Sequence, residues 1–252
     1  MENKDHQRII RERQSTLEEN ETLWGNYWES LNLSLKDALV QPVNYQTAST
    51  IILKYEWLGN MGTTEYSYGI YFDDVLGGVV CFGHTGGTNV YASALPQNHN
   101  LMITLNRGAC AFWTPTGSAS KLISTACRMM GENGYYGFVA YADPKAGEVG
   151  TVYQACNWLY CGLTNPTEQS RTPNGDVKDA RLVHNYTRDM RFGKLRYKRT
   201  RAEQKKLMVD QGYQFFKGHS KGRYIGIYGS RKIKKELYKE LNWSNYPYPK
   251  RI

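Results

Sequence analysis

The feature that most constrains the fold of this chain is an alternation of strand and helix patterns along residues 101–160. The first strand pattern ends at a small-residue loop, and Gly134 closes the helix pattern that follows it. Alternation of this kind is typical of an α/β layer in which neighbouring strands run parallel. In order, the sequence predicts a strand at 101–113, a helix at 118–130, a strand at 136–142 and a short helix at 151–160.

The segments on either side of this layer predict further elements of a sheet flanked by helices. Two strand patterns, 66–72 and 77–82, surround the turn Asp73-Asp74 and predict a hairpin. The segments 83–100 and 165–200 are rich in polar and turn-forming residues and are predicted to be loops. Later patterns predict a helix at 201–211, a strand at 222–228 and a helix at 232–241.

Residues 1–35 are predicted to be helical, with a polar beginning and one apolar face. The charged, Gln-rich residues 1–20 have no apolar stretch behind them, so we expect no secretory signal. The chain also contains no apolar run long enough to span a bilayer, and we expect a cytoplasmic protein. The apolar face of the predicted helix comprises Leu17, Leu23, Trp24, Trp28 and Leu31.

The basic charge of the chain is concentrated in its C-terminal part. Residues 176–252 hold 21 Lys and Arg against 7 Asp and Glu, whereas residues 1–175 hold 11 against 16. A solvated helix face would explain lysines alone, but here arginines alternate with aromatic residues, a pattern that favours a nucleic-acid partner. The residues that we expect to contact double-stranded DNA are Arg196, Arg199, Arg201, Lys221 and Arg223.

Cysteine and histidine usage does not indicate a metal or disulfide framework. The five cysteines form no CxxC pair, are odd in number and lie in apolar segments, so we expect reduced core thiols. The five histidines are scattered and show no ligand spacing, so the sequence gives no support for a bound metal.

The loop that leads from the first predicted strand into the first helix is a candidate anion site. Free N–H groups at a helix start, with Gly117 allowing close approach of the backbone, suit a pyrophosphate. Ser118 and Ser120 would add hydroxyl donors. The Walker order is absent, and an ordinary N-cap by Ser118 is the alternative interpretation.

The end of the second predicted strand is a candidate catalytic site. Asp143 stands where ligands usually bind in open α/β sheets, although an Asp before Pro is also a common turn residue. Glu148 is a second acid/base candidate. Tyr153 and Asn157 lie four residues apart on one helix face, and a half-buried, locally bonded Tyr153 is the alternative to a proton donor.

Two further segments mix aromatic and basic residues. Lys54-Tyr55-Glu56-Trp57 precedes a flexible Gly-rich link, and it would make either a stacking wall for a planar substrate or an amphipathic edge packed on the core. The basic approach to the strand at 222–228, 217–224, suits either phosphate contact or an exposed turn.

Taken together, these segments resemble the Mom-like phage proteins, adenine-modifying proteins related to the Gcn5-type N-acetyltransferase fold. The resemblance covers roughly residues 50–165 and part of the C-terminal tail, and residues 1–45 fall outside it. It is carried by the order Arg107-Gly108-Ala109, Trp113-x-Pro115, Ser118-Ala119-Ser120-Lys121-Leu122-Ile123, Tyr141-Ala142-Asp143, and Gly147-Glu148-x-Gly150-Thr151-Val152-Tyr153-Gln154-Ala155-x-Asn157-Trp158.

The resemblance implies a Gcn5-related N-acetyltransferase-like mixed sheet flanked by helices. Its expected parts are a helical extension (1–45), a catalytic core (46–175) and a basic part (176–252) that completes the fold and contacts DNA. The implied reaction converts adenine in DNA to an N6-carbamoylmethyl (acetamido) form with an acyl-CoA-like donor, protecting phage DNA from host restriction. The residues expected to act are Asp143, Tyr153, Tyr55 and Glu148 in catalysis, and Arg107, Gly117, Ser118, Ser120 and Asn157 in donor binding.

One departure from the family pattern concerns the segment before Tyr55. The family has a His there, and this chain has Lys54, so no role of that His, metal binding included, is carried over. Two alternatives remain open: an N-acyltransferase acting on another amine or hypermodified base, and a catalytically inactive DNA-binding protein of the same fold. A homodimer is also left open by the sequence.

Overall fold

The computed structural model describes all residues except 1–5, 22–26, 85–88, 180–182, 184–199 and 251–252. The chain forms two compact units, which are described separately. The main unit consists of residues 1–162 and 222–252, and the inserted unit consists of residues 163–221. The strand at 222–227 belongs to the sheet of the main unit.

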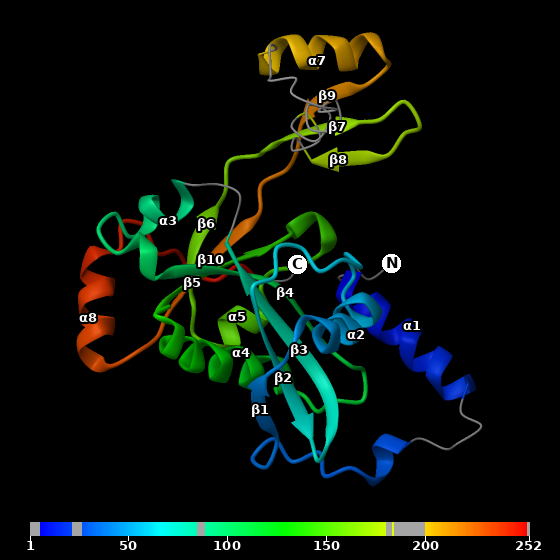
Figure 1. The fold of residues 1–252 in the computed structure, drawn as a ribbon, viewed down its shortest axis with the longest axis vertical. Helices are drawn as coiled ribbons and strands as arrows, with labels where there is room; N and C mark the ends of the chain where they lie inside the picture. The colour runs from blue at the N-terminus through cyan, green and yellow to red at the C-terminus, as the bar shows by residue number, and fades with distance from the viewer. Residues whose placement is uncertain (1–5, 22–26, 85–88, 180–182, 184–199, 251–252) are drawn as a thin grey trace, which may run out of the picture. The chain divides into compact units, whose positions relative to one another are not determined.

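The main unit is built on one mixed seven-stranded sheet in the order β1-β2-β3-β4-β5-β10-β6 (Figure 1). β4 and β5 run parallel, while β1–β2, β2–β3, β3–β4 and β5–β10 are antiparallel pairs. The predicted α/β class, with a mixed sheet flanked by helices, is therefore confirmed. The strands are β1 Leu39–Pro42, β2 Tyr66–Phe72, β3 Val75–Gly83, β4 Met102–Cys110, β5 Gly137–Ala142, β6 Leu159–Leu163 and β10 Gly222–Ile227.

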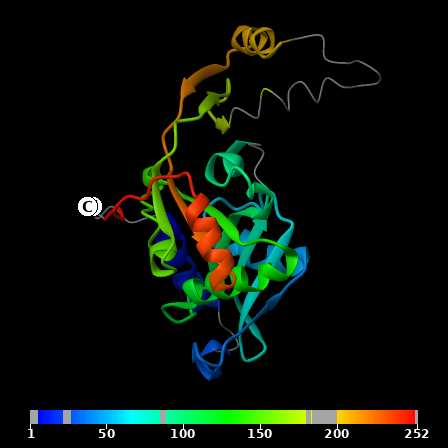
Figure 2. The same ribbon diagram turned by 90° about the vertical axis from the view of Figure 1, so that its left-hand side faces the viewer.

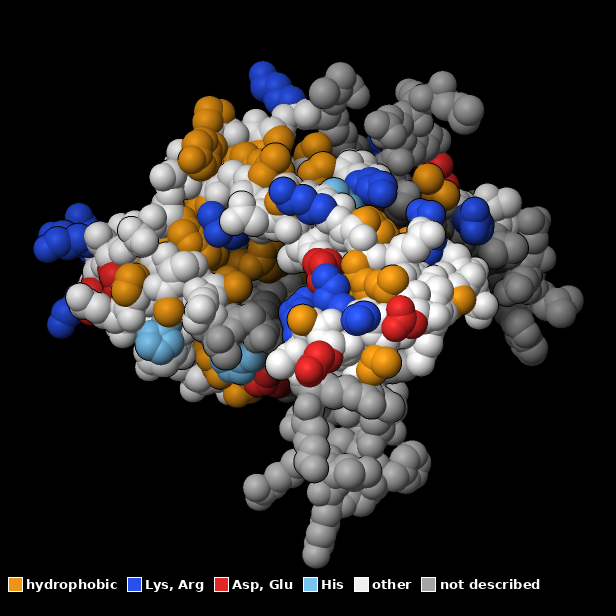
Figure 3. All heavy atoms as spheres, turned by 90° about the horizontal axis from the view of Figure 1, so that it is seen from above, with side chains coloured by type: hydrophobic (Ala, Val, Ile, Leu, Met, Phe, Trp, Pro, Cys, Tyr) orange, Lys and Arg blue, Asp and Glu red, His pale blue; other side chains and the backbone are white. Residues whose placement is uncertain are grey.

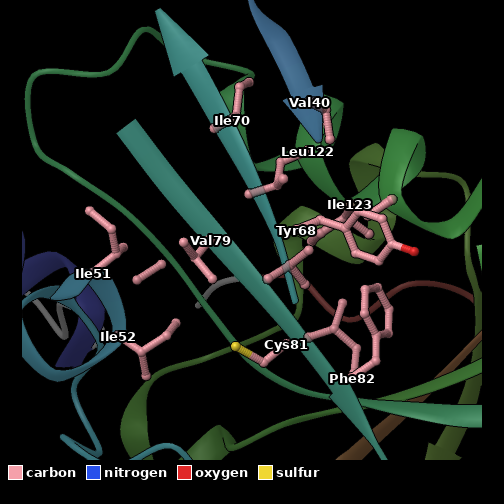
Figure 4. Close-up of a cluster of buried hydrophobic side chains, with 14 of the residues drawn as sticks. Val40, Ile51, Ile52, Tyr68, Ile70, Val79, Cys81, Phe82, Leu122 and Ile123 are labelled. Atoms are coloured by element: carbon pink, nitrogen blue, oxygen red, sulfur yellow. The ribbon is translucent and has the colours of Figure 1, made fainter. Parts of the chain in front are cut away.

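Two helices, α2 (Tyr45–Tyr55) and α4 (Ser118–Met129), cover opposite faces of the strands β2 and β3. Successive side chains of a strand point to opposite faces, so β3 supplies apolar contacts to both helices. Figure 4 shows this division, with Val79 and Cys81 turned toward Ile51 and Ile52 of α2, and Tyr68, Ile70 and Phe82 on the side of Leu122 and Ile123 of α4.

A second apolar cluster lies where β5 and β10 meet the helices α3 (Asn89–Ala94) and α8 (Arg231–Glu240). Figure 2 shows α8 running across this part of the sheet. Leu237 is the buried residue of α8, and it packs in the same cluster as Val139 and Ile225. Ser230 caps the helix by accepting a hydrogen bond from the Ile233 N–H at 3.3 Å.

β4 and β5 diverge soon after they meet. Their ladder contains only Met102–Gly137, Ile103–Phe138 and Thr104–Val139, although β4 continues to Cys110 and β5 to Ala142. The register of β3 against β4 also shifts between Cys81 and Phe82. A bulge of this kind bends the strand, which fits the divergence. The loops that follow the two strands carry most of the predicted site.

Three predicted loops or helix ends differ from the structure. Segment 83–100 contains α3, and segment 165–200 contains the strands β7 (Glu168–Arg171) and β8 (Val177–Asp179). The helix predicted at 151–160 is α5, Thr151–Ala155, and ends five residues early. The reason is Asn157, whose φ of 56° reverses the chain so that residues 159–163 join the sheet as β6.

The inserted unit has a three-stranded antiparallel sheet in the order β8-β7-β9, with β9 at Gln214–Lys217, and the helix α7 at Arg201–Asp210. Thr200 and Glu203 form a capping box at the start of α7. Glu168 of β7 accepts hydrogen bonds from Lys205 at 2.5 Å and Arg201 at 3.2 Å. These two contacts lower the pKa of Glu168 below its ordinary value.

Within the described parts of both units, no helix has the length and apolar character needed to cross a membrane.

Candidate active site at the divergence of β4 and β5

A buried carboxylate, Glu56, stands at the C-terminal end of α2. Its N–H donates to the Ile52 carbonyl, and its backbone then leaves the helix in an extended conformation. The carboxylate accepts a hydrogen bond from the Leu58 N–H at 2.9 Å and lies 4.0 Å from the Nε of Arg107. Burial raises the pKa of Glu56 above its ordinary value, although Arg107 acts in the opposite direction. A buried carboxyl with a raised pKa is a candidate acid or base.

Arg107, predicted to hold donor phosphates, is engaged by the loop that follows α2. Its Nε donates to the Asn60 carbonyl at 2.8 Å, and its Nη2 donates to the Asn60 side chain at 2.7 Å. Its Nη1 donates to the carbonyl of Asn106 at 2.6 Å. The guanidinium therefore holds the 60–62 loop against β4, and any phosphate contact would compete with these bonds.

Glu148 connects the end of α2 to the loop between β5 and α5. One carboxylate oxygen accepts from the indole Nε1–H of Trp57 at 2.9 Å, and the other accepts from the N–H of Asp143 at 3.0 Å. These two segments are separated by about 90 residues in sequence but are joined through one side chain. This geometry supports a positioning role for Glu148 rather than that of a proton-transferring base.

Asp143 directly follows β5 and is the N-cap of the short 3-10 helix at Pro144–Ala146. Its carboxylate accepts a hydrogen bond from the Lys145 N–H at 3.0 Å, as expected for a turn Asp before Pro, and the residue is 9% exposed. The turn interpretation and a functional one are compatible, because a carboxylate has several acceptor positions. Its catalytic role remains a prediction.

Tyr153 lies in an aromatic cluster beneath this loop. Its ring stacks on Trp158 with centroids 5.3 Å apart and lies at the same distance from Tyr224. Burial raises the pKa of Tyr153 well above its ordinary value, and the nearby carboxylate of Glu148 raises it further. The raised pKa keeps the hydroxyl protonated but makes it a weaker acid. Glu148, which acts on Tyr153, also accepts a hydrogen bond from the Asp143 N–H, so Glu148 links the two residues.

Two other predicted site residues, Tyr55 and Asn157, occupy positions that core packing and backbone conformation explain. Tyr55 is only 5% exposed, and the Nζ of Lys54 lies 5.0 Å from the centre of its ring. Trp57, by contrast, is partly exposed. Asn157, predicted to bind the donor, is exposed at the turn where its positive φ ends α5. Its place at that turn explains the residue type, and donor contact stays a prediction.

The start of α4 has the predicted strand–loop–helix geometry. Gly117 adopts φ 96° and precedes the first turn, where a Cβ would lie 3.0 Å from Leu35. The hydroxyl of Ser118 donates to the Pro115 carbonyl at 2.6 Å, and that of Ser120 donates to the Gly117 carbonyl at 2.9 Å. Because both hydroxyls donate within their own turn, an anion here would rely mainly on backbone N–H groups.

The predicted DNA-contacting residues are only partly within the described structure. Arg196 and Arg199 lie outside it, and Arg201 forms the ion pair with Glu168. The N–H of Lys221 donates to Thr164. Arg223 stacks 3.7 Å above the ring of Trp243 and donates to the Cys161 carbonyl. On the face drawn in Figure 3, the described Lys and Arg side chains are scattered among hydrophobic and neutral ones.

All five cysteines are free thiols, three of them buried. Burial raises the pKa of each, to about 12 at Cys110 and to about 11 at Cys161. They are therefore protonated and poorly nucleophilic at neutral pH. Among the described residues, no group of three His, Cys, Asp or Glu side chains is arranged to hold a metal ion.

Sequence comparison assigns the family. Residues 37–250 match the sequence profile of the Mom protein family, which is most of the chain. The chain belongs to the Mom protein family. The match confirms the resemblance described from individual segments, and in this Mom-family chain it extends through the inserted unit to the C-terminal tail. A search of curated proteins finds no match.

Several solved structures can be superposed loosely on this Mom-family chain. A Bacillus subtilis acetyltransferase in complex with CoA gives a TM-score of 0.39 at 9% identity, covering 76% of this chain and 98% of its own. An N-acetyltransferase from Staphylococcus aureus Mu50 gives 0.39 at 12%, with coverage of 76% and 98%. A GNAT family acetyltransferase from Elizabethkingia anophelis with acetyl-CoA bound gives 0.36 at 9%, with the same coverage.

Proposed function

We propose that this Mom-family chain is a DNA-modifying transferase that converts adenine in phage DNA to its N6-carbamoylmethyl form, protecting that DNA from host restriction. Family membership supports the reaction class. The structural observation that supports a catalytic protein is the group of Asp143, Glu148 and Tyr153 beside Glu56 and Trp57, at the point where β4 and β5 diverge.

The chemistry begins from a weak nucleophile. The lone pair of the adenine N6 amine is delocalised into the ring, so a nearby base has to accept its proton or hydrogen bond as the new bond forms. Asp143 is proposed as that acceptor. Tyr153 is proposed to assist the leaving group by donating a hydrogen bond from its hydroxyl.

The target base must also leave the DNA stack, since an enzyme cannot reach N6 chemistry inside the duplex. An extruded base is usually held against aromatic side chains. Trp57 is preferred to Tyr55 for this contact, because Trp57 is partly exposed and Tyr55 is buried. Its indole orientation is set by the hydrogen bond to Glu148.

An acyl-CoA-like donor is proposed to bind here. The carbamoylmethyl product is bonded to N6 through its CH2 carbon and not through a carbonyl carbon, so the donor has to present that CH2 carbon to N6. The new N–C bond forms as the bond from this carbon to the leaving group breaks and Asp143 accepts the N6 proton. Two features fit such a molecule. The ladder between β4 and β5 stops at Thr104–Val139. Beyond that pair, the backbone groups on the facing edges of the two strands are not bonded to each other. They can therefore form hydrogen bonds with the amide groups of an extended donor. The start of α4, at Gly117, presents helix N–H groups to phosphate oxygens.

The test compares two aspartates in bacterial cells that express the full chain. DNA is digested to nucleosides, and the modified adenine nucleoside is quantified by mass spectrometry. Asp143→Asn keeps an oxygen that can accept from Lys145 but removes the negative charge, and it should abolish most of the modification. Asp74→Asn, at the exposed β2–β3 turn, is the matched control and should leave modification unchanged. Full modification by Asp143→Asn would show that the proposed role is wrong.

A transferase acting on another amine is the second candidate. The observation that favours it is that Arg201 and Arg223, expected to contact DNA, are held by Glu168 and Trp243. DNA binding measured across a salt series separates the two functions. A steep decrease of affinity with salt indicates several phosphate contacts and supports the DNA-modifying function, whereas a shallow slope supports the second candidate.

A further inference from the structure

Helix α1 (His6–Glu21) packs on the main unit through a polar face. Among the residues of α1 whose burial is described, the partly buried ones are Gln7, Ile10, Arg11, Gln14 and Ser15, at the spacing that places side chains on one side of a helix. Ile9 is exposed. Figure 1 shows α1 beside α2. The contact depends on hydrogen bonds, which are directional and specify which backbone groups are held.

Two glutamines of α1 hold the C-terminal end of α2. The Nε2 of Gln7 donates to the Tyr55 carbonyl, and its Oε1 accepts from the Trp57 N–H at 3.2 Å. The Nε2 of Gln14 donates to the Lys54 carbonyl. The last carbonyls of a helix have no partner within the helix, so α1 satisfies groups that α2 cannot. This is the segment that carries Glu56 and Trp57 of the candidate site.

Arg11 holds the other side of the site. Its Nη2 donates to the carbonyl of Phe112 at 2.7 Å and to that of Thr114 at 2.9 Å. These residues belong to the loop that connects β4 to the start of α4. The ring of Phe112 is fixed separately by an edge-on contact with Trp28 at 5.1 Å. One helix therefore contacts both the C-terminal end of α2 and the loop that follows β4.

We propose that α1 is a strap that positions the candidate active site, with Arg11 as its positioning residue for the 112–117 loop and Gln7 for Trp57. α1 lies outside the part of the chain that matches the family profile, which begins at residue 37. By contacting both segments, the strap would hold the 112–117 loop and Trp57 at a fixed distance from each other. Only its effect on modification rests on the proposed function.

Hydrogen exchange in the full chain tests the strap directly. Arg11→Met keeps a long side chain but removes both hydrogen bonds that Nη2 donates. Arg13→Met is the matched control, because Arg13 is exposed on the opposite side of α1. Arg11→Met should speed exchange of the loop amides of Thr114 and Ser118 about fivefold, which corresponds to about 1 kcal/mol for lost hydrogen bonds. Arg13→Met should not change it.

The same measurement on Gln7→Met should speed exchange of the Trp57 amide, whose acceptor it removes. Nucleoside analysis should show severalfold less modification with Arg11→Met than with Arg13→Met. Equal exchange in Arg11→Met, Arg13→Met and the unaltered chain would overturn the strap. If the unaltered chain leaves DNA nucleosides unchanged, the proposed function fails, and the exchange comparison still decides whether α1 positions the loop.

Discussion

Replacing Glu148 by Gln is expected to weaken the connection between α2 and the loop after β5. The carboxylate accepts from two donors, the Trp57 indole and the Asp143 N–H. A Gln side chain has one oxygen, so its amide group must face one of these donors and lose that hydrogen bond. A hydrogen bond to a charged group contributes about 1.5–3 kcal/mol. We therefore expect the free energy of unfolding to decrease by about 2 kcal/mol.

Urea unfolding of the full chain measures this effect as a lower midpoint with an unchanged slope. Glu132→Gln, at an exposed glutamate of the main unit, is the control and should change stability by no more than about 0.5 kcal/mol. Trp57→Phe removes the indole donor, so Glu148→Gln should cost less in that background. If Glu148→Gln is as stable as Glu132→Gln, the bridging carboxylate does not contribute as argued.

Two further predictions concern packing and pH. A Cβ at Gly226 would lie 2.4 Å from the fully buried Trp158, so Gly226→Ala should lower the free energy of unfolding by about 1–3 kcal/mol, whereas Gly108→Ala, with its nearest atom at 3.7 Å, should cost less in the same thermal melts. Because burial raises the pKa of Glu56, the folded chain binds this proton more tightly than the unfolded chain. Its contribution to stability should thus be lost as pH rises from about 4.5 through the raised pKa. The urea unfolding midpoint of Glu56→Gln should not show this loss of stability with rising pH. If the midpoints of the unaltered chain and of Glu56→Gln depend on pH in the same way, the pKa of Glu56 is not raised.

The elements that the sequence predicts correctly are those with strong local patterns. The hairpin at 66–83, the helix starting at Ser118 and the strand at 137–142 all follow from periodicity and turn residues. β6 was missed because its position depends on the positive φ of Asn157, a conformation that few residue types favour and that sequence periodicity does not encode. The return of residues 222–227 to the main sheet is also a long-range pairing.

The same distinction between local patterns and long-range contacts applies to the residues of the candidate site. Asp143, Glu148 and Tyr153 are close in sequence, so one predicted strand end brings them together. Glu56 was not predicted as a site residue, because its burial and its 4.0 Å approach to Arg107 depend on packing between distant segments. The sequence does not predict the polar contacts of α1, because apolar periodicity indicates only apolar packing. Of the predicted apolar residues of the N-terminal segment, Trp28 is buried against Phe112.

We propose that this Mom-family chain modifies adenine in DNA. The most direct measurement is mass spectrometry of nucleosides from DNA of cells that express the unaltered chain, compared with cells that carry the empty vector. DNA from cells that express the chain should contain a new deoxyadenosine derivative in which a carbamoylmethyl group replaces one hydrogen on N6. An identical nucleoside profile in the two cultures, with the folded chain present, would contradict the claim.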